Sequence, residues 1–246
     1  MFRAMTGLLL GLAIATASPA RAGERILIDE ANPPFMYADA GKPAGIYNAL
    51  ISEAFRRIGL AADMSAAPWK RAIAGLDAAE NGVGGIYSNA ERQRKYDFSD
   101  KLFDEVIVVY VPKARAFGFS GVDSLKGKTV GVIRGWSYGD DFDAAVKAGT
   151  IRTEETASDA SNFAKLALGR IDAVLAIREA GKVAMAAQGV GEKVTALDPP
   201  LSSNPSFLAF SRQAGKGELL GRFNTALGAM RRDGSFERIT AAALAK

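Results

Sequence analysis

Cysteine and histidine are both absent from the 246-residue sequence. The chain therefore has no disulfide framework, and it lacks the thiolate and imidazole groups that bind most transition metals. It also lacks the commonest general base, the imidazole ring. These absences exclude a zinc enzyme, a cysteine hydrolase and a Ser-His-Asp triad, and we expect neither a metal nor a cofactor.

A large excess of charge of one sign is also missing. The sequence holds 31 Lys and Arg against 27 Asp and Glu, a formal net charge of +4. Its densest cationic cluster, Arg92, Arg94 and Lys95, has no aromatic platform on which nucleic-acid bases could stack. We therefore expect no nucleic-acid partner. With 48% hydrophobic residues, the chain can bury one large core or two modest ones.

Residues 1–22 have the pattern of a secretory signal peptide. Arg3 supplies the positive start, residues 8–15 form a short apolar run, and Ala-Arg-Ala at residues 20–22 has the small residues of a cleavage site. The apolar run is too short to span a bilayer permanently, and without cysteine the site cannot carry a lipid anchor. We expect a soluble periplasmic protein whose mature chain begins at Gly23.

The most informative stretch is residues 84–100. Two glycines and the Ile-Tyr pair that ends at Tyr87 predict the end of a buried strand, and Ser88 and Asn89 then offer a helix N-cap. Arg92 falls in the first turn of that helix, beside free backbone N–H groups. Its forked guanidinium can donate two parallel hydrogen bonds to a carboxylate. The alternative interpretation is that Arg92 is one more charge on a solvated helix face.

Other positions also offer contacts to a ligand. A buried strand ends in Asp29, and the carboxyl ends of parallel strands line the ligand crevice of an open α/β sheet. Trp69 falls in the first turn of a helix, where a place in the core and a place facing a ligand are both open. The Gly-rich turn that contains Trp136 and Ser137 can present its N–H groups to an anion.

The stretch around Arg92 also carries a family resemblance. Glu91-Arg92 followed, after four residues, by Asp-Phe-Ser-Asp at residues 97–100 resembles a signature of the periplasmic amino-acid-type (family 3) solute-binding proteins, the receptors of ABC importers. The resemblance covers nearly all of the chain after residue 22, and it implies that Arg92 clamps the α-carboxylate of a ligand. Asn89 stands where the family has Thr, and Tyr87 where it commonly has Ser or Thr. The arginine of the signature is present, whereas two residues beside it differ from the family pattern.

The resemblance assigns roles to the other candidates as well. It implies that Trp69 packs on the side chain of the ligand, and that Ser137 faces the ligand carboxylate from across the cleft. The acid that holds the ligand's ammonium would fall at Ile177, whose alkyl side chain cannot accept a hydrogen bond. Either Glu179 or Asp29 replaces that acid, or the ligand carries no ammonium.

We therefore expect an α/β chain with the two-lobed periplasmic-binding-protein fold, in which crossover strands over residues 105–111 and 206–210 form a hinge and the ligand cleft lies between the lobes. Residues 23–111 and 207–246 would form lobe 1, and residues 112–206 would form lobe 2. The expected function is that of an exported, monomeric receptor. It would close around a small carboxylate-bearing solute, either an amino acid or an organic acid without an amine, and deliver it to an ABC permease.

Two other functions remain open. A few members of the fold that the chain resembles are periplasmic dehydratases of cyclohexadienyl acids, and Glu179 or Asp29 could be the general acid of such an enzyme only if burial raised its pKa. A protein that senses a ligand and signals to a membrane kinase, without transport, is the other. We expect binding and no catalysis. The residues expected to bind the ligand are Arg92, Trp69, Asn89, Tyr87, Ser137, Trp136 and Asp29.

Overall fold

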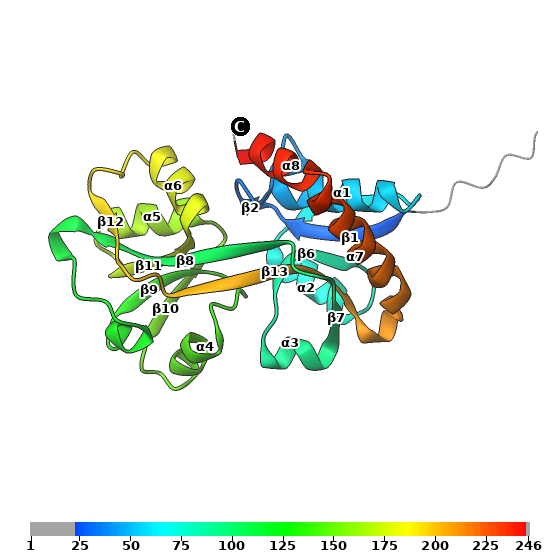
Figure 1. Cartoon of the computed structure of the whole chain (residues 1–246). Coiled ribbons are helices and arrows are strands. Elements are labelled where there is room, and N and C mark those ends of the chain that lie inside the picture. The colour runs from blue at the N-terminus through cyan, green and yellow to red at the C-terminus, as the bar shows by residue number, and fades with distance from the viewer. Residues whose placement is uncertain (1–22, 245–246) are drawn as a thin grey trace, which may run out of the picture.

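The computed structural model describes residues 23–244, and within them the chain folds into two α/β lobes (Figure 1). The segment 1–22, interpreted above as a signal peptide, lies outside the described residues. Two long strands, β8 (Phe103–Pro112) and β13 (Ser202–Ser211), run side by side from one lobe to the other. The two-lobed α/β fold predicted from the sequence is confirmed.

A single sheet passes through both lobes, with its main path in the order β10-β9-β11-β8-β13-β6-β1-β5. In the first lobe β1 pairs in parallel with β5 and β6, and in the second lobe β9 pairs in parallel with β10 and β11. The first-lobe strands are β1 (Glu24–Asp29), β5 (Ala62–Ala67), β6 (Gly82–Tyr87) and β7 (Tyr96–Phe98). The second-lobe strands are β9 (Thr129–Ile133), β10 (Arg152–Thr156), β11 (Ala173–Ile177) and β12 (Val194–Ala196).

Helices cover the sheet in both lobes, and the helices at the end of the chain return to the first lobe (Figure 1). The first-lobe helices are α1 (Ile46–Arg57), α2 (Trp69–Asp77), α3 (Ala90–Lys95), α7 (Gly217–Arg232) and α8 (Ser235–Leu244). The second-lobe helices are α4 (Asp140–Lys147), α5 (Asp159–Ala167) and α6 (Arg178–Ala187). The short elements are strands β2 (Ala31–Asn32), β3 (Met36–Asp39) and β4 (Lys42–Ala44), and the 3-10 turns η1 (Lys113–Arg115), η2 (Val122–Leu125) and η3 (Arg212–Ala214).

The spacing of apolar residues explains helix α1. The fully buried residues that recur at helical spacing are Ile46, Leu50, Ile51, Ala54 and Phe55. Phe55 packs on Phe223 of α7, with 5.7 Å between the ring centroids. Helix α1, near the start of the chain, and helix α7, near its end, therefore share one core. Gly59 follows with a φ of +72°, the left-handed conformation that ends a helix.

The crossover strands are longer than predicted. β13 begins at Ser202 rather than Ser206, and its first residues pair antiparallel with residues 103–107 of β8. Pro205, opposite Asp104, takes part in this pairing although it has no N–H to donate. Beyond it β8 pairs with β11 of the second lobe, and β13 pairs with β6 of the first. The lobes therefore share two hydrogen-bonded strands, while lobe boundaries at residues 111 and 206 stay predictions.

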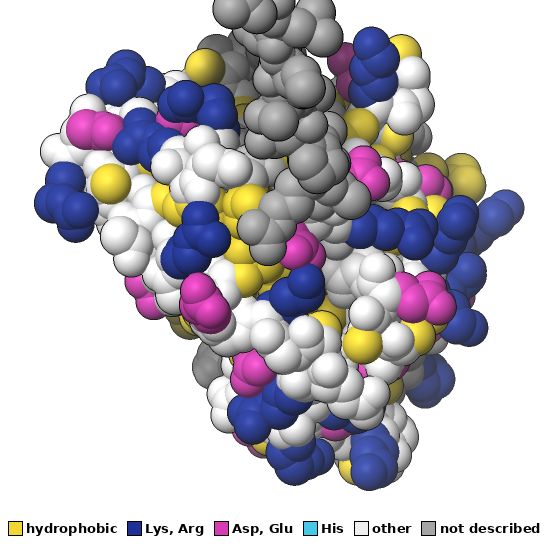
Figure 2. All heavy atoms as spheres, turned by 90° about the vertical axis from the view of Figure 1, so that its right-hand side faces the viewer, with side chains coloured by type: hydrophobic (Ala, Val, Ile, Leu, Met, Phe, Trp, Pro, Cys, Tyr) yellow, Lys and Arg dark blue, Asp and Glu magenta, His cyan; other side chains and the backbone are white. Residues whose placement is uncertain are grey.

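The outer end of the first lobe carries charges of both signs. Figure 2 shows Lys and Arg side chains there in several separate groups, with Asp and Glu between them. None of the helices between residues 23 and 244 is long and apolar enough to cross a membrane.

Candidate functional site

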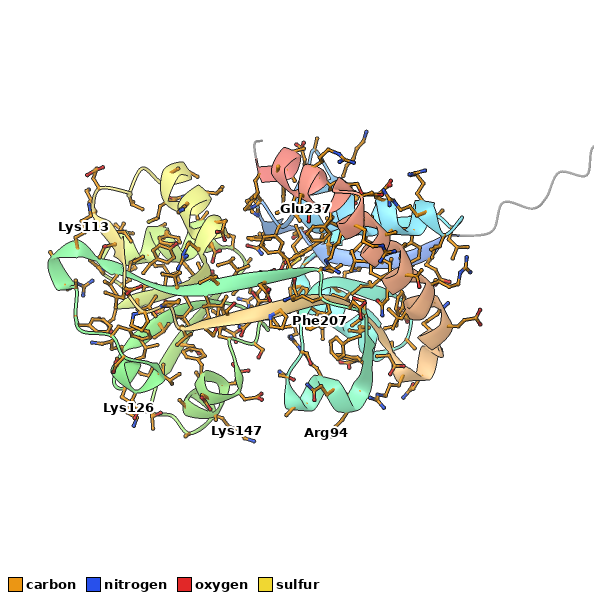
Figure 3. The ribbon with its side chains drawn as sticks, viewed as in Figure 1. Arg94, Lys113, Lys126, Lys147, Phe207 and Glu237 are labelled. Carbon is orange, nitrogen blue, oxygen red and sulfur yellow. The ribbon has the colours of Figure 1, made fainter. Side chains whose placement is uncertain are left out.

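Arg92 occupies the place that capping predicts. The side chain of Asn89 caps helix α3 by accepting a hydrogen bond from the backbone N–H of Arg92, with 2.8 Å between N and Oδ1. The guanidinium of Arg92 turns back and donates from Nη1 to the carbonyl oxygen of Tyr87 at 2.9 Å. Burial lowers the pKa of Arg92, whereas Arg94 lies exposed on the outer edge of the same helix (Figure 3). The solvated-face interpretation therefore fits Arg94 and not Arg92.

Three hydrogen bonds join the two lobes at this place. Trp69 donates from Nε1 to the carbonyl oxygen of Gly135 at 3.1 Å, and Asn89 donates from Nδ2 to Oγ of Ser137 at 3.2 Å. Trp136 of the second lobe donates from Nε1 to Oδ2 of Asp29 at 3.2 Å. The structure thus brings together the residues that the sequence singled out: Arg92, Trp69, Asn89, Tyr87, Ser137, Trp136 and Asp29.

The indole ring of Trp136 packs between the lobes beside Arg92. Its ring centroid lies 6.0 Å from that of Trp69 and 6.4 Å from that of Tyr87, both in edge-to-face geometry. Trp69 is only 5% exposed, and its ring packs edge-to-face against Trp136. The cavity enclosed beside Arg92 has a volume of about 10 Å³, about enough for one water molecule. Trp136 therefore closes one side of this small cavity from the second lobe.

The Gly-rich turn of the second lobe holds a carboxylate of its own. Ser137 donates its hydroxyl proton to Oδ2 of Asp143, and the backbone N–H of Tyr138 donates to Oδ1 of the same residue at 3.2 Å. Asp143 lies in the first turn of α4, where the helix dipole favours an anion. The donors that were expected to face a ligand carboxylate are thus bound to Asp143.

Two buried acids, one in each lobe, have raised pKa values. Asp29 is 2% exposed and accepts hydrogen bonds from the backbone N–H of Ala31 and from Trp136, yet burial raises its pKa to about 6. Asp159, the first residue of α5, is 4% exposed. Burial raises its pKa to about 7, and the charge of Asp29 adds to the shift. Sequence reasoning singled out Asp29 and gave Asp159 no place among the ligand-binding residues.

Sequence reasoning also missed Glu105, which is 1% exposed in crossover strand β8. Its carboxyl group accepts hydrogen bonds from the hydroxyl groups of Tyr47 and Tyr87, and burial raises its pKa well above the usual range. The one available signal was an acid at the start of a β-branched run. Glu179, the other acid considered above, is half-buried in the first turn of α6, and its charge acts on Glu105 and Tyr110.

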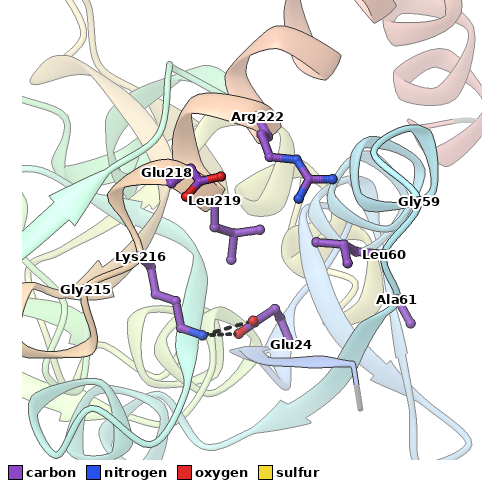
Figure 4. Close-up of a pocket in the computed structure, with 9 residues that line it drawn as sticks. All are labelled: Glu24, Gly59, Leu60, Ala61, Gly215, Lys216, Glu218, Leu219 and Arg222. Carbon is purple, nitrogen blue, oxygen red and sulfur yellow. Dashed lines mark hydrogen bonds and ion pairs between the residues drawn. The ribbon is translucent and has the colours of Figure 1, made fainter. Parts of the chain in front are cut away.

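A larger pocket of about 440 Å³ opens next to Trp69 between the lobes, within the range of small-molecule sites. Its lining residues are Asp29, Glu30, Pro68, Trp69, Lys70, Arg71 and Ala74 from the first lobe, and Ile133, Arg134, Thr156 and Ala157 from the second. Another hollow lies between the end of α1 and the start of α7, where Lys216 pairs with Glu24 at 2.9 Å (Figure 4). Like the small cavity beside Arg92, the pocket beside Trp69 draws its walls from both lobes.

A family model for bacterial extracellular solute-binding proteins, family 3, matches residues 25–245. Two proteins of Escherichia coli (strain K12) are similar in sequence. The L-cystine-binding protein TcyJ is 28% identical over an alignment of 222 positions, which covers 85% of this chain and 77% of that protein's own length. The lysine/arginine/ornithine-binding periplasmic protein is 27% identical over an alignment of 248 positions, which covers 94% of this chain and 92% of that protein's own length.

Solved structures share the arrangement of the lobes. A histidine kinase sensor domain with similarity to periplasmic binding proteins superposes with a TM-score of 0.81 at 21% identity, and covers 92% of this chain and 97% of its own. The ancestral amino acid-binding protein AncCDT-1, a precursor of cyclohexadienyl dehydratase, superposes with a TM-score of 0.74 at 22% identity. The superposition covers 91% of this chain and 96% of the other. At such low identity, the likeness shows the fold alone.

Proposed function

Because the chain belongs to family 3 of the bacterial extracellular solute-binding proteins, we propose that it is an exported receptor for a small carboxylate-bearing solute. The receptor acts as a monomer in the periplasm and hands the solute to an ABC permease. The similar proteins of Escherichia coli bind L-cystine and lysine, arginine or ornithine, which supports an amino acid as the solute.

The position of Arg92 is the observation that carries this proposal. Its guanidinium is partly buried at the junction of the lobes, and its side-chain hydrogen bond goes to the neutral carbonyl oxygen of Tyr87. Between residues 23 and 244 no carboxylate forms an ion pair with it. A desolvated guanidinium is stabilised most by a carboxylate that accepts two parallel hydrogen bonds. The carboxylate of a solute meets this requirement.

The hydrogen bonds between the lobes support closure of the cleft around a solute. The hydrogen bonds of Trp69, Asn89 and Trp136 cross between the lobes. A solute that enters an open cleft takes the place of Trp136 beside Arg92, and it contacts both lobes only when they close. Binding energy then drives the hinge at β8 and β13 toward the closed form.

A binding screen of the purified protein tests the proposal. We expect at least one carboxylate-bearing solute, from a panel of amino acids and organic acids, to raise the melting temperature, and the matched amide without that carboxylate to have no effect. If no carboxylate-bearing compound stabilises the protein, the proposal fails. Deletion of the gene then separates transport from sensing, because only a transport receptor is required for uptake of the solute.

One observation favours a catalytic alternative. A general acid needs a pKa near the working pH, and burial raises the pKa of Asp29 in the cleft to about 6. A dehydratase of cyclohexadienyl acids could use such a carboxyl group to protonate the leaving hydroxyl group. Incubation of the protein with a cyclohexadienyl acid, followed by NMR, decides between the two functions: aromatisation that is lost in Asp29→Asn would establish the enzyme, and an unchanged spectrum would leave the receptor.

A further inference from the structure

Glu105 places a carboxyl group inside one of the two strands that join the lobes. The residue lies near the start of β8 and is 1% exposed. Each of its oxygens is held by a phenol: Oε1 accepts from the hydroxyl group of Tyr47 on α1, and Oε2 accepts from that of Tyr87 at the end of β6. A buried carboxyl group is costly unless hydrogen bonds compensate for the lost water. The two phenols supply that compensation.

The same network reaches the second crossover strand. The hydroxyl oxygens of Tyr47 and Ser206 lie 2.7 Å apart, and Ser206 donates to the carbonyl oxygen of Phe103 at 3.3 Å. Ser206 is fully buried, and it is the residue at which β13 changes its pairing partner from β8 to β6. The network of Glu105 therefore joins β6 of the first lobe to both crossover strands (Figure 1).

The packing of Tyr47 fixes one side of the network. Its ring is fully buried against Gly85 of β6, where an added Cβ atom would come within 2.6 Å of ring carbon Cδ2. Gly85 also has a φ of +80°, a conformation that residues with a side chain rarely adopt. Only glycine therefore lets the backbone of β6 approach the ring so closely, two residues before Tyr87.

Tyr87 connects the network to the proposed solute site. Its carbonyl oxygen accepts the hydrogen bond from Nη1 of Arg92 at 2.9 Å, and its ring centroid lies 6.4 Å from that of Trp136. Tyr87 and Arg92 also line the same small cavity. One residue thus bonds to Glu105 through its hydroxyl group and to Arg92 through its backbone.

We propose that Glu105 is a positioning residue of the solute site: it holds the hydroxyl group of Tyr87, and Tyr87 in turn holds the guanidinium of Arg92. This inference rests on the proposed function and deepens it, because it adds a residue that shapes the site from the hinge without touching the solute. A residue that only filled the core would be better apolar, since burying a carboxyl group is costly.

The neutral form of Glu105 suggests how to test this role. Burial raises the pKa of Glu105 well above its usual range, which favours the neutral carboxyl group. A glutamine side chain matches that group in shape, with one oxygen that accepts and a nitrogen that donates. In Glu105→Gln the amide oxygen can accept from Tyr87, while the amide N–H donates to the oxygen of Tyr47. A leucine of similar size can do neither.

Calorimetry on two variants of Glu105 measures the effect on the site. The probe is the compound, among the twenty standard amino acids, L-cystine and L-ornithine, that binds the unmodified protein best. Glu105→Leu should weaken binding about tenfold or more, because the solute must then immobilise the side chains of both Tyr87 and Arg92. In Glu105→Gln the affinity should stay within about threefold of the unmodified protein, because the hydrogen bonds are replaced.

Combined variants show whether Glu105 acts through Tyr87. Tyr87→Phe removes the hydroxyl group that Glu105 holds and should weaken binding by a similar factor. In that background Glu105→Leu should add less than about twofold, because substitutions of residues in one network are not additive. Tyr47→Phe is the matched control: it removes the other phenol hydroxyl from Glu105 at a residue that does not line the cavity. It should lower the free energy of unfolding but change the affinity less than Tyr87→Phe does.

Fluorescence tests the same role without a solute. In a Trp69→Phe background Trp136 is the only tryptophan, and its ring packs on Tyr87. If Glu105 holds Tyr87, Glu105→Leu makes Trp136 more accessible to quenching by acrylamide, and Glu105→Gln does not. Equal quenching in the two variants would contradict the inference.

Three binding results would also overturn the inference. These are unchanged affinity in Glu105→Leu, an equal loss in Glu105→Gln, and losses of Glu105→Leu and Tyr87→Phe that add in full. Glu105→Ala serves as a second variant if Glu105→Leu does not fold. Failure of every carboxylate-bearing compound to bind would instead overturn the proposed function, and the quenching of Trp136 would still decide the role of Glu105.

Discussion

The two lobes contribute different polar groups to the cleft between them. The first lobe offers Arg92, a partly buried guanidinium that, among residues 23–244, donates its side-chain hydrogen bond to a backbone carbonyl oxygen. In the second lobe, the turn predicted to help hold the same anion has Ser137 and the N–H of Tyr138 bound to Asp143. That lobe also carries Asp159, an acid whose buried oxygen Oδ1 has no hydrogen-bond partner among residues 23–244.

This difference shows why matching residue types across a cleft is not enough to assign a clamp. A hydroxyl group and a Gly-rich turn become an anion site only if no carboxylate of the protein binds there first. In this chain Asp143, six residues after Ser137, accepts those hydrogen bonds. We therefore expect Arg92 of the first lobe to hold the anionic end of the solute.

The largest effect expected is on Arg92. Arg92→Ala should reduce the affinity for the solute by about 2–5 kcal/mol, because it leaves a buried carboxylate without its partner. Calorimetry with the best-binding amino acid measures the change. Arg94→Ala, two residues further along α3, is the matched control and should have almost no effect, since its guanidinium is exposed. Equal losses in the two variants would refute the assignment of the anion to the first lobe.

Asp29 and Asp159 should make the ligand-free protein less stable as the pH rises. Burial raises the pKa of Asp29 to about 6 and that of Asp159 to about 7. In the unfolded chain both carboxyl groups are ionised above about pH 5, whereas in the folded protein they stay protonated to higher pH. The free energy of unfolding should therefore fall from pH 5 through pH 7, by on the order of 1–3 kcal/mol, and then level off.

Denaturant unfolding at intervals between pH 5 and pH 8 measures this slope. Asp159→Asn should flatten it, because the amide does not titrate. Glu53→Gln is the control: hydrogen bonds from Arg56 and Arg57 lower the pKa of Glu53 to about 2, so most of its contribution lies below this pH range. A slope that is the same with and without Asp159 would mean that this carboxyl group is not strained by burial.

Trp69 should matter more for binding than for folding. Its ring packs on Trp136 of the other lobe, a contact that opening of the cleft removes. Trp69→Ala should weaken solute binding about tenfold and should destabilise the ligand-free protein less than Leu76→Ala. Leu76 lies fully buried in the same helix, and its truncation should cost about 2–5 kcal/mol. If thermal unfolding shows a greater loss for Trp69→Ala, the residue belongs to the core of the first lobe.

The smallest effect is expected at Ser137. Ser137→Ala removes a hydrogen bond to Asp143 and one from Asn89, and should lower affinity by about 0.5–1.5 kcal/mol through weaker closure. Ser120→Ala, an exposed position of the same lobe, is the control. A loss at Ser137 as large as that at Arg92 would show that both lobes bind the carboxylate, and the contrast between them would no longer hold.

Local features of the site were predictable because they depend on neighbours in sequence. The cap formed by Asn89, the place of Arg92 in the first turn of α3 and the start of α2 at Trp69 each involve a few consecutive residues. The extent of β13 was not, because residues 202–205 become a strand only by pairing with β8, about a hundred residues earlier in the chain. Considered without strand β8, the Ser, Asn and Pro residues at positions 202–205 favour a loop.

The sequence by itself determined the class of fold, the apolar spacing of α1, and the presence of one well-placed guanidinium near Tyr87. Tertiary structure alone decided which groups are already bound and which are free. Glu105 meets the hydroxyl of Tyr47 across 58 positions of sequence, and Trp136 meets Asp29 across 107. Hydrogen bonds and burial depend on distance in space, so the unused oxygen of Asp159 became visible only once both lobes were in place.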